Sequence, residues 1–276
     1  MVSPLLLMTS MILLGVSADA PATSTVYKVG IVPQFDVAHT EAIWRPLLAE
    51  IGKRTGLKLE VVASENFPSF EKDLAAAHFD FAYMNPFQFL LARRNQSYEP
   101  LVRDGAAKVQ GILVVRKDSR VQKPEELAGQ TIAFPGANAV AASMLIRAGL
   151  ERDFKIAYTP NFLANHTAAY EAVVAGSAAA AGGARATLAE QPEAIRNQLR
   201  VVFETASFAS LPFTGHVRVP AAEREKVKQA FLAIEADPAA QAMLRSVPIK
   251  EAVSAAMSDY RQLAHWGLER YYVPPK

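Results

Sequence analysis

The chain alternates short apolar runs with segments whose apolar residues recur at helical spacing. YKVGIVP (27–33) is an apolar run, and leucines and isoleucines then lie three or four positions apart from Ile43 to Ile51, before Gly56. This spacing predicts a strand followed by an amphipathic helix that ends at the glycine. The same succession repeats through most of the chain, which predicts parallel sheets covered by helices on both faces.

Two blocks of the pattern, 26–110 and 120–207, are similar in size, and no Gly/Ser-rich or Pro-rich tether separates them. Extended runs near 111–117 and 211–219 are interpreted as paired crossings between two lobes. We therefore expect an α/β fold of two lobes, with 26–112 plus 216–276 in lobe 1 and 113–215 in lobe 2. Two lobes joined by two strands can close on something held between them. The alternative is one larger sheet.

Four predicted helices begin at or beside an asparagine, namely Asn66, Asn85, Asn138 and Asn165. An Asn side chain at a helix start can accept from the free N–H groups of the first turn. In a parallel sheet, such corners lie at the carboxyl ends of the strands, where open α/β folds bind ligands. Helix starts also favour anions. A single corner is better explained by ordinary capping, but four of them in a two-lobed fold predict a site for a small anionic or polar solute.

Composition limits the other possibilities. The 276 residues are 51% hydrophobic, which is enough for a large core, and no cysteine is available for disulfides, thiol catalysis or thiolate metal sites. The net charge of +2 comes from scattered basic residues, so nothing indicates nucleic-acid binding. Residues 1–18 carry no charge and precede small residues, which predicts a signal peptide over 1–20 and a periplasmic location, with an uncleaved anchor as the alternative.

Motifs for common chemistry are absent from the sequence. The five histidines, at 39, 78, 166, 216 and 265, include no pair at the i, i+4 spacing of a helical metal site. The chain has no G-x-S-x-G elbow, P-loop or dinucleotide fingerprint, and no paired carboxylates for acid/base work. We expect a binding protein without cofactor or metal rather than an enzyme.

Several stretches together resemble a known family. FDFAYMNPFQFLLA (79–92), YEPLVRDG (98–105), GILVVRKDS (111–119), ELAGQTIAFPGANAVAAS (126–143) and AAAAGG (178–183) occur in the order found in phosphonate/phosphite-type periplasmic solute-binding proteins of ABC importers. The resemblance covers nearly all of the chain after the leader. It implies the two-lobed type II periplasmic binding protein fold, with each lobe a mostly parallel sheet flanked by helices, two crossover strands and a ligand in the cleft.

The resemblance also implies site residues, and the residues themselves add others. The corners carried over from the family are Asn66 with Phe67, then Asn85 with Phe87 and Gln88, then Asn138 with Ala139, Val140 and Ala141, and His166. Gln34 and Phe35 follow the first strand, as a cleft loop would, and Arg185 could pair with a charge on the ligand. His166 could instead cap its own helix, and Arg185 could instead face solvent.

The chain departs from the family where the ligand should bind. Ala139, Val140 and Ala141 replace a run of hydroxyl side chains found in phosphonate binders, and no acidic residue follows AAAAGG. A carboxylate, another oxyanion or an organic ligand with an apolar body therefore fits at least as well as a phosphonate. We expect a monomer that delivers its solute to an ABC permease. The alternative is a protein that docks on a sensor kinase or chemoreceptor.

Overall fold

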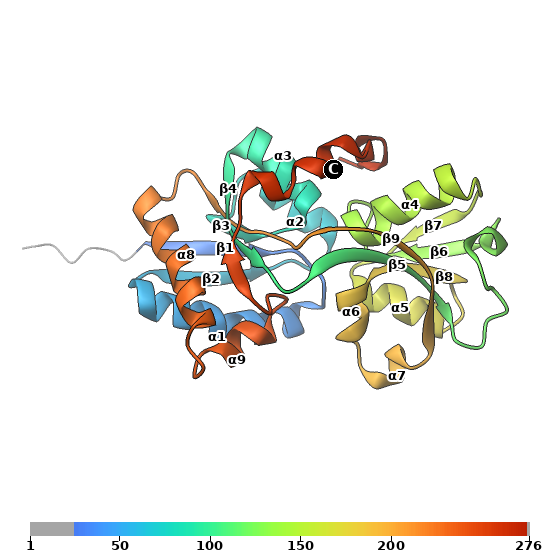
Figure 1. The fold of residues 1–276 in the computed structure, drawn as a ribbon, viewed down its shortest axis with the longest axis horizontal. Coiled ribbons are helices and arrows are strands. Elements are labelled where there is room, and N and C mark those ends of the chain that lie inside the picture. Colours follow the sequence, from blue (N-terminus) through green and yellow to red (C-terminus); the bar gives the residue numbers. More distant parts are fainter. Residues whose placement is uncertain (1–24, 275–276) are drawn as a thin grey trace, which may run out of the picture.

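The strands form two separate sheets, one in each of two α/β units that lie side by side (Figure 1). This computed structural model describes residues 25–274, so the predicted leader over 1–20 lies outside the described residues. The strand order is β11-β4-β10-β3-β1-β2 in the first sheet and β7-β6-β8-β5-β9 in the second. The prediction of two units rather than one larger sheet is confirmed. The exact lobe boundaries stay a prediction.

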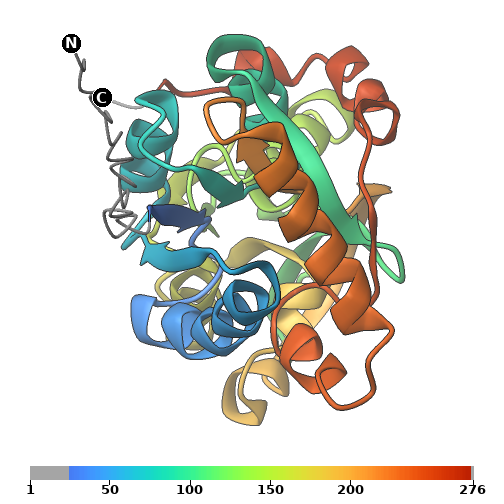
Figure 2. The ribbon, with the colours of Figure 1, turned by 90° about the vertical axis from the view of Figure 1, so that its left-hand side faces the viewer.

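The first sheet has a parallel half and an antiparallel half. Its strands are β1 (Val26–Ile31), β2 (Lys58–Ala63), β3 (Phe81–Tyr83), β4 (Tyr98–Asp104), β10 (Phe213–His216) and β11 (Ala252–Ser254). β1 runs parallel to β2 and β3, whereas β10 runs antiparallel to β3 and β4. Its helices are α1 (Val37–Thr55), α2 (Phe67–Ala75), α3 (Pro86–Gln96), α8 (Ala221–Glu235) and α9 (Gln241–Ser246). Figures 1 and 2 show α1 and α9 below this sheet and α2 and α3 above it.

Helix α1 shows how the sequence pattern becomes packing. Asp36 caps its start by accepting from the N–H of His39, and Gly56 ends it in the left-handed conformation with φ 74°. The buried stripe of the helix includes Trp44, whose ring lies 5.0 Å from that of Tyr83 in β3. The apolar face therefore packs on the sheet, and the loop before the helix is held at the sheet's carboxyl edge.

The second sheet is also mixed. Its strands are β5 (Lys108–Arg116), β6 (Thr131–Phe134), β7 (Thr159–Phe162), β8 (Ala180–Ala184) and β9 (Leu199–Ala209). β6 runs parallel to β7 and β8, whereas β5 runs antiparallel to β8 and β9. The helices of this unit are α4 (Ile146–Ala148), α5 (His166–Val174), α6 (Arg185–Ala189) and α7 (Glu193–Arg196), with a 3₁₀ turn at Pro124–Leu127. α4 is the centre of a longer helix that has π turns at Val140–Leu145 and Gly149–Asp153.

The two predicted crossings do not pair with each other, which corrects the prediction. β5 starts the second sheet directly after β4, as predicted, but its antiparallel partners are β8 and β9, not the run 211–219. That run contains β10, which belongs to the first sheet. Both runs are extended and apolar, so local pattern could not tell which strand pairs with which. The chain therefore returns to the first unit between Ala209 and Phe213.

The end of the chain spans the two units a third time. After β11 it forms 3₁₀ turns at Met257–Asp259, Arg261–His265 and Leu268–Tyr271, which run along the top of the molecule toward α4 (Figure 1). Tyr271 packs with Val140 and Met144 in one apolar cluster. The buried guanidinium of Arg147 donates to the carbonyl groups of Ala137 (2.7 Å) and Tyr271 (2.6 Å). The sequence pattern had indicated only a return to the first lobe.

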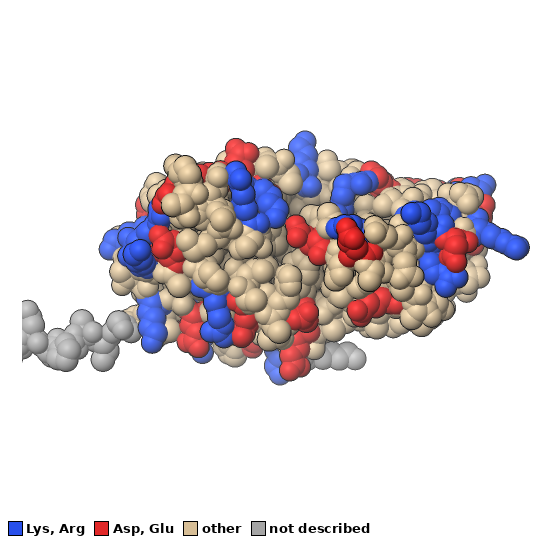
Figure 3. Space-filling view, turned by 90° about the horizontal axis from the view of Figure 1, so that it is seen from below, with Lys and Arg blue, Asp and Glu red and all other residues tan. Residues whose placement is uncertain are grey.

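Charged side chains of both signs are interspersed on the face seen from below (Figure 3). A nucleic-acid interface would instead gather basic side chains on one face.

Across residues 25–274, none of the helices has the length and apolar character needed to cross a bilayer.

Candidate functional site

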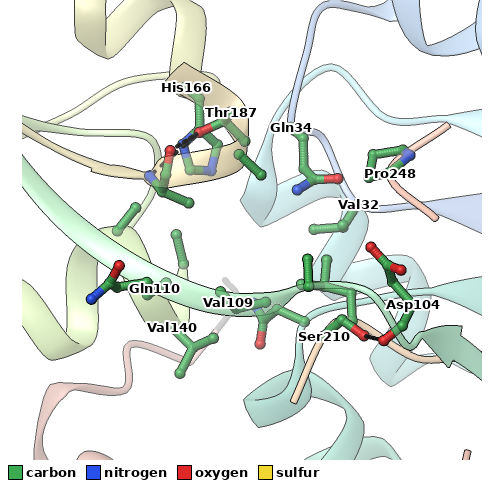
Figure 4. A pocket seen from close by; sticks show the side chains of 18 of the residues that line it. Val32, Gln34, Asp104, Val109, Gln110, Val140, His166, Thr187, Ser210 and Pro248 are labelled. Carbon is green, nitrogen blue, oxygen red and sulfur yellow. Dashed lines mark hydrogen bonds between the residues drawn. The ribbon is translucent and has the colours of Figure 1, made fainter. Parts of the chain in front are cut away.

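A cavity with an empty volume of about 700 Å³, including the part open to solvent, lies where the two units meet (Figure 4). Each of the four predicted corners contributes to its wall, through Phe67, Asn85, the segment 139–142 and His166. The connections between the sheets add residues 107–110 and 210–211. The arrangement brings helix starts from both units to one space, which is the geometry that the strand-to-helix corners predicted.

The sequence-predicted residues divide into two groups. Those that line the cavity are Gln34, Phe67, Asn85, Ala139, Val140, Ala141 and His166. Those that lie elsewhere are Phe35, Asn66, Phe87, Gln88, Asn138 and Arg185. Ligand contact stays a prediction for the first group. Each residue of the second group either makes a contact with another part of the protein or lies outside the lining of this cavity.

Three of the asparagines cap helices as predicted. The side chain of Asn66 accepts from the N–H of Ser69, that of Asn85 from Gln88, and that of Asn165 from Ala168. The side chain of Asn138 caps no helix, because the helix begins one residue later and Ala139 stands at its cap position. Capping is decided by the nearest few residues, which is why sequence reasoning succeeded at the other three corners.

Asn138 instead joins a buried cluster between the units. Its Nδ2 donates to Oε2 of Glu71 (2.8 Å) and to the carbonyl of Val273 (2.7 Å), while its Oδ1 accepts from the N–H of Val273 (2.9 Å). Gln88 donates to the other oxygen of Glu71 (2.9 Å). Burial raises the pKa of Glu71, although the two amide groups act in the opposite direction. Asn138 and Gln88 therefore support the cavity wall from behind.

Replacing Asn138 with alanine should lower the free energy of unfolding by about 2 kcal/mol. The change leaves Oε2 of Glu71 buried without its donor and removes both hydrogen bonds to Val273. Urea unfolding followed by circular dichroism measures the effect. The exposed Asn95 of α3 gives a matched control, N95A, which should stay close to wild type. Equal stability of the two variants would contradict the role of this cluster.

Phe35, Phe87 and Arg185 each lie in a different place outside the main cavity. Phe35 lines a second cavity that shares six residues with the first, Asp104 and Thr187 among them. Phe87 is buried, with its ring 5.8 Å from that of Tyr272. Arg185 is exposed and pairs with Glu204, so its charge is already matched.

His166 is the titratable side chain at the start of α5. Its ring is 5% exposed, and its Nδ1 lies 3.0 Å from Oγ1 of Thr187, so only Nε2 is free to face the cavity. Burial lowers the pKa of His166 from 6.5 to about 3. The imidazole is therefore neutral at physiological pH. It can exchange one hydrogen bond with a ligand but offers no positive charge.

Two glycines let the helix start come very close to the second sheet. A Cβ on Gly182 of β8 would lie 1.9 Å from the carbonyl oxygen of Ala142, and one on Gly111 of β5 would lie 2.3 Å from that of Ala141. Only residues without a side chain allow this approach. The first-turn N–H groups of Val140, Ala141 and Ala142 find no acceptor within residues 25–274. Because these three residues line the cavity, their N–H groups are candidate donors to a ligand.

Sequence reasoning missed the cavity residues that come from the crossing segments. Asp104 ends β4, Val109 and Gln110 lie in β5, and Ser210 follows β9. None of them stands at a strand-to-helix corner, so no local signal marked them. The only signal was indirect, because a two-lobed fold must place its crossings beside the cleft.

Among residues 25–274, no group of three or more histidine, aspartate or glutamate side chains is arranged to hold a metal ion. The cavity wall itself carries one carboxylate, Asp104, and one exposed ammonium, Lys108. The arrangement suits reversible binding of a small molecule by main-chain donors, a few polar side chains and apolar surface.

Comparison with known proteins gives a consistent result. Residues 29–260 match the family described as "ABC transporter, phosphonate, periplasmic substrate-binding protein". The phosphate-import protein PhnD of Mycolicibacterium smegmatis is 22% identical over 221 residues, which cover 72% of this chain and 69% of that protein.

Solved structures share the architecture. A binding protein component of an ABC phosphonate transporter from Pseudomonas aeruginosa aligns with a TM-score of 0.77 at 15% identity, over 89% of this chain and 86% of that one. PhnD1 from Prochlorococcus marinus, in complex with methylphosphonate, aligns with a TM-score of 0.79 at 13% identity, over 90% and 99%. At such identities the likeness shows the shared fold, and the ligand has to be inferred from the residues that line the cavity.

Proposed function

The chain belongs to the phosphonate-type family of periplasmic substrate-binding proteins of ABC transporters, and from this premise we propose that it captures a small polar solute between its two units and delivers it to a membrane permease. The observation that carries the proposal is the cavity to which all four strand-to-helix corners contribute. A ligand that contacts both units stabilises the closed arrangement, and closure is what a permease can recognise.

The family is a transporter component, which favours import over docking on a sensor kinase or chemoreceptor. We propose a monomer whose segment 1–20 directs it to the periplasm. We also propose binding without chemistry, because a general base works best with a pKa near the operating pH and that of His166 is about 3. The relatives named for phosphate and phosphonate make these solutes the first to test.

Filling the cavity should abolish solute binding without unfolding the protein. Ala186 lies on the exposed first turn of α6 and lines both cavities, so A186W places an indole in the space that a solute needs. Thermal-shift and calorimetric titration against oxyanions, phosphonates, carboxylates and amines measure binding. For scale, a ligand at one hundred times its Kd stabilises a protein by about 2.7 kcal/mol.

The matched control is A189W, on the exposed other end of the same short helix and outside both cavities. It should bind like wild type. If A186W and A189W bind a solute equally well, the solute does not occupy this cavity. If the wild-type protein binds no small molecule at all, the proposed function fails.

A further inference from the structure

Asp104 places a buried carboxylate on the wall of the cavity. It ends β4, the residue is 4% exposed, and it lines both the main cavity and the adjoining one. Its Oδ1 accepts from the N–H groups of Ala106 (3.0 Å) and Glu251 (3.1 Å). Figure 4 shows the carboxylate beside Val32 and Pro248, on the side of the cavity opposite His166.

No basic side chain within residues 25–274 lies at ion-pair distance from Asp104. The neighbouring Arg103 pairs with Asp259 at 3.0 Å and donates only to the main-chain carbonyl of Asp104. Oδ2 of Asp104 has no hydrogen-bond partner among residues 25–274, because both N–H groups bind Oδ1. Oδ2 is not among the buried side-chain atoms that lack a partner, so it is accessible on the cavity wall, and a positively charged ligand group could pair with it there.

The side chains that usually bind oxyanions are missing from this wall or already engaged. The hydroxyl of Ser210 donates to the carbonyl of Asp104 (2.6 Å), and that of Tyr83 donates to the carbonyl of Pro248 (3.1 Å). Oγ1 of Thr187 donates to the carbonyl of Ala184 (2.9 Å). His166 is neutral, and the one lining ammonium, that of Lys108, belongs to an exposed residue.

A phosphonate dianion would thus meet chiefly uncharged donors, namely the main-chain N–H groups of residues 140–142, the Gln34 amide and the His166 imidazole, with the charge of Asp104 in the same cavity. Charge-assisted donors are the strong contacts of phosphate sites, and the described wall supplies almost none of them. An ammonium group would instead find an unpaired carboxylate. Apolar surface for the rest of such a ligand comes from Val32, Phe67, Val109 and Leu211.

We propose that the solute carries an ammonium group that pairs with Asp104, while its apolar body lies in the cavity and a carbonyl or carboxylate can reach the free amides of residues 140–142. This inference rests on the proposed function and names the chemical class of its ligand. The Ala139, Val140 and Ala141 segment and the Asp104 carboxylate then act together. The segment lacks the hydroxyl donors that bind phosphoryl anions, and the carboxylate repels such anions, so both lower the affinity of the site for them.

A matched set of probes tests the charge preference. The protein is unfolded, dialysed and refolded to remove any bound solute, and then titrated with leucine, 3-methylbutylamine, 4-methylpentanoate and methylphosphonate. The first three share one apolar body and differ in the ammonium and carboxylate groups. The two amines should bind at least about 10-fold more tightly than the two anions without an ammonium group. A wider set of amines, amino acids, carboxylates and alkylphosphonates extends the comparison.

Substitution of Asp104 connects the preference to this carboxylate. D104N keeps the oxygen that accepts from Ala106 and Glu251 but removes the charge, so ammonium-bearing probes should bind about 10- to 100-fold more weakly. The exposed Asp118 gives the control, D118N, which should bind like wild type. Gln34, in the loop after β1, gives a second variant that avoids the buried position. Q34K should weaken ammonium binding as well.

The outcomes separate the two proposals. Tightest binding by methylphosphonate or 4-methylpentanoate, or equal amine affinity in D104N and wild type, overturns the ammonium inference and leaves a solute-binding protein. Absence of binding by every probe, together with no bound solute in native mass spectrometry of the protein before refolding, overturns the proposed function and this inference with it.

Discussion

Lowering the pH from 7 to 4 should destabilise the protein by about 3 kcal/mol through the single imidazole of His166. Its pKa falls from 6.5 to about 3 on folding because the ring is buried. At pH values between these two pKa values, His166 is protonated in the unfolded chain and neutral in the folded chain. Stability from this group is therefore complete above pH 6.5 and is lost as the pH falls toward 3.

The variant H166F isolates this effect, because phenylalanine keeps an aromatic ring at the position and does not titrate. Thr187 retains its hydrogen bond to the carbonyl of Ala184 in the variant. Urea unfolding at pH 4, 5, 6, 7 and 8 should show a flatter stability profile for H166F than for wild type. H78Q, at a surface histidine whose side chain is 64% exposed, should follow the wild-type profile. Parallel profiles of wild type and H166F would contradict the prediction.

Replacing Gly182 with alanine should lower the free energy of unfolding by about 3 kcal/mol and weaken solute binding. The new methyl group would lie 1.9 Å from the carbonyl oxygen of Ala142, which is main chain and cannot rotate away. Either β8 or the helix start at Val140 must move. Because residues 139–142 line the cavity, the shift displaces the main-chain donors that we propose for the solute.

Gly149, in the helix that begins at Val140, provides the control for Gly182 of β8. Gly149 has helical backbone angles of −62° and −50°, and an added Cβ would lie 3.0 Å from the edge of the Phe203 ring, which is a side chain that can adjust. G149A should therefore stay within about 1 kcal/mol of wild type, because alanine also favours the helix. Urea unfolding and probe titration measure both variants. Similar losses in G182A and G149A would show that the close approach is not the cause.

The sequence alone determined the succession of strands and helices, the two α/β units and three of the four capped corners. These features depend on the spacing of apolar residues and on contacts within one turn of helix, such as that from Asn85 to the N–H of Gln88. Those corners, together with the family resemblance, supplied the thirteen candidate residues, of which seven line the cavity, Phe67, Asn85 and His166 among them.

Only the tertiary structure decided which extended run pairs with β5, where Asn138 points and that Asp104 faces the cavity. Each of these depends on partners far away in the sequence: Glu71 and Val273 for Asn138, and the main chain at Glu251 for Asp104. A pattern of apolar and polar positions records which residues are buried. It does not record which distant groups meet there, and here those meetings fix the charge of the site.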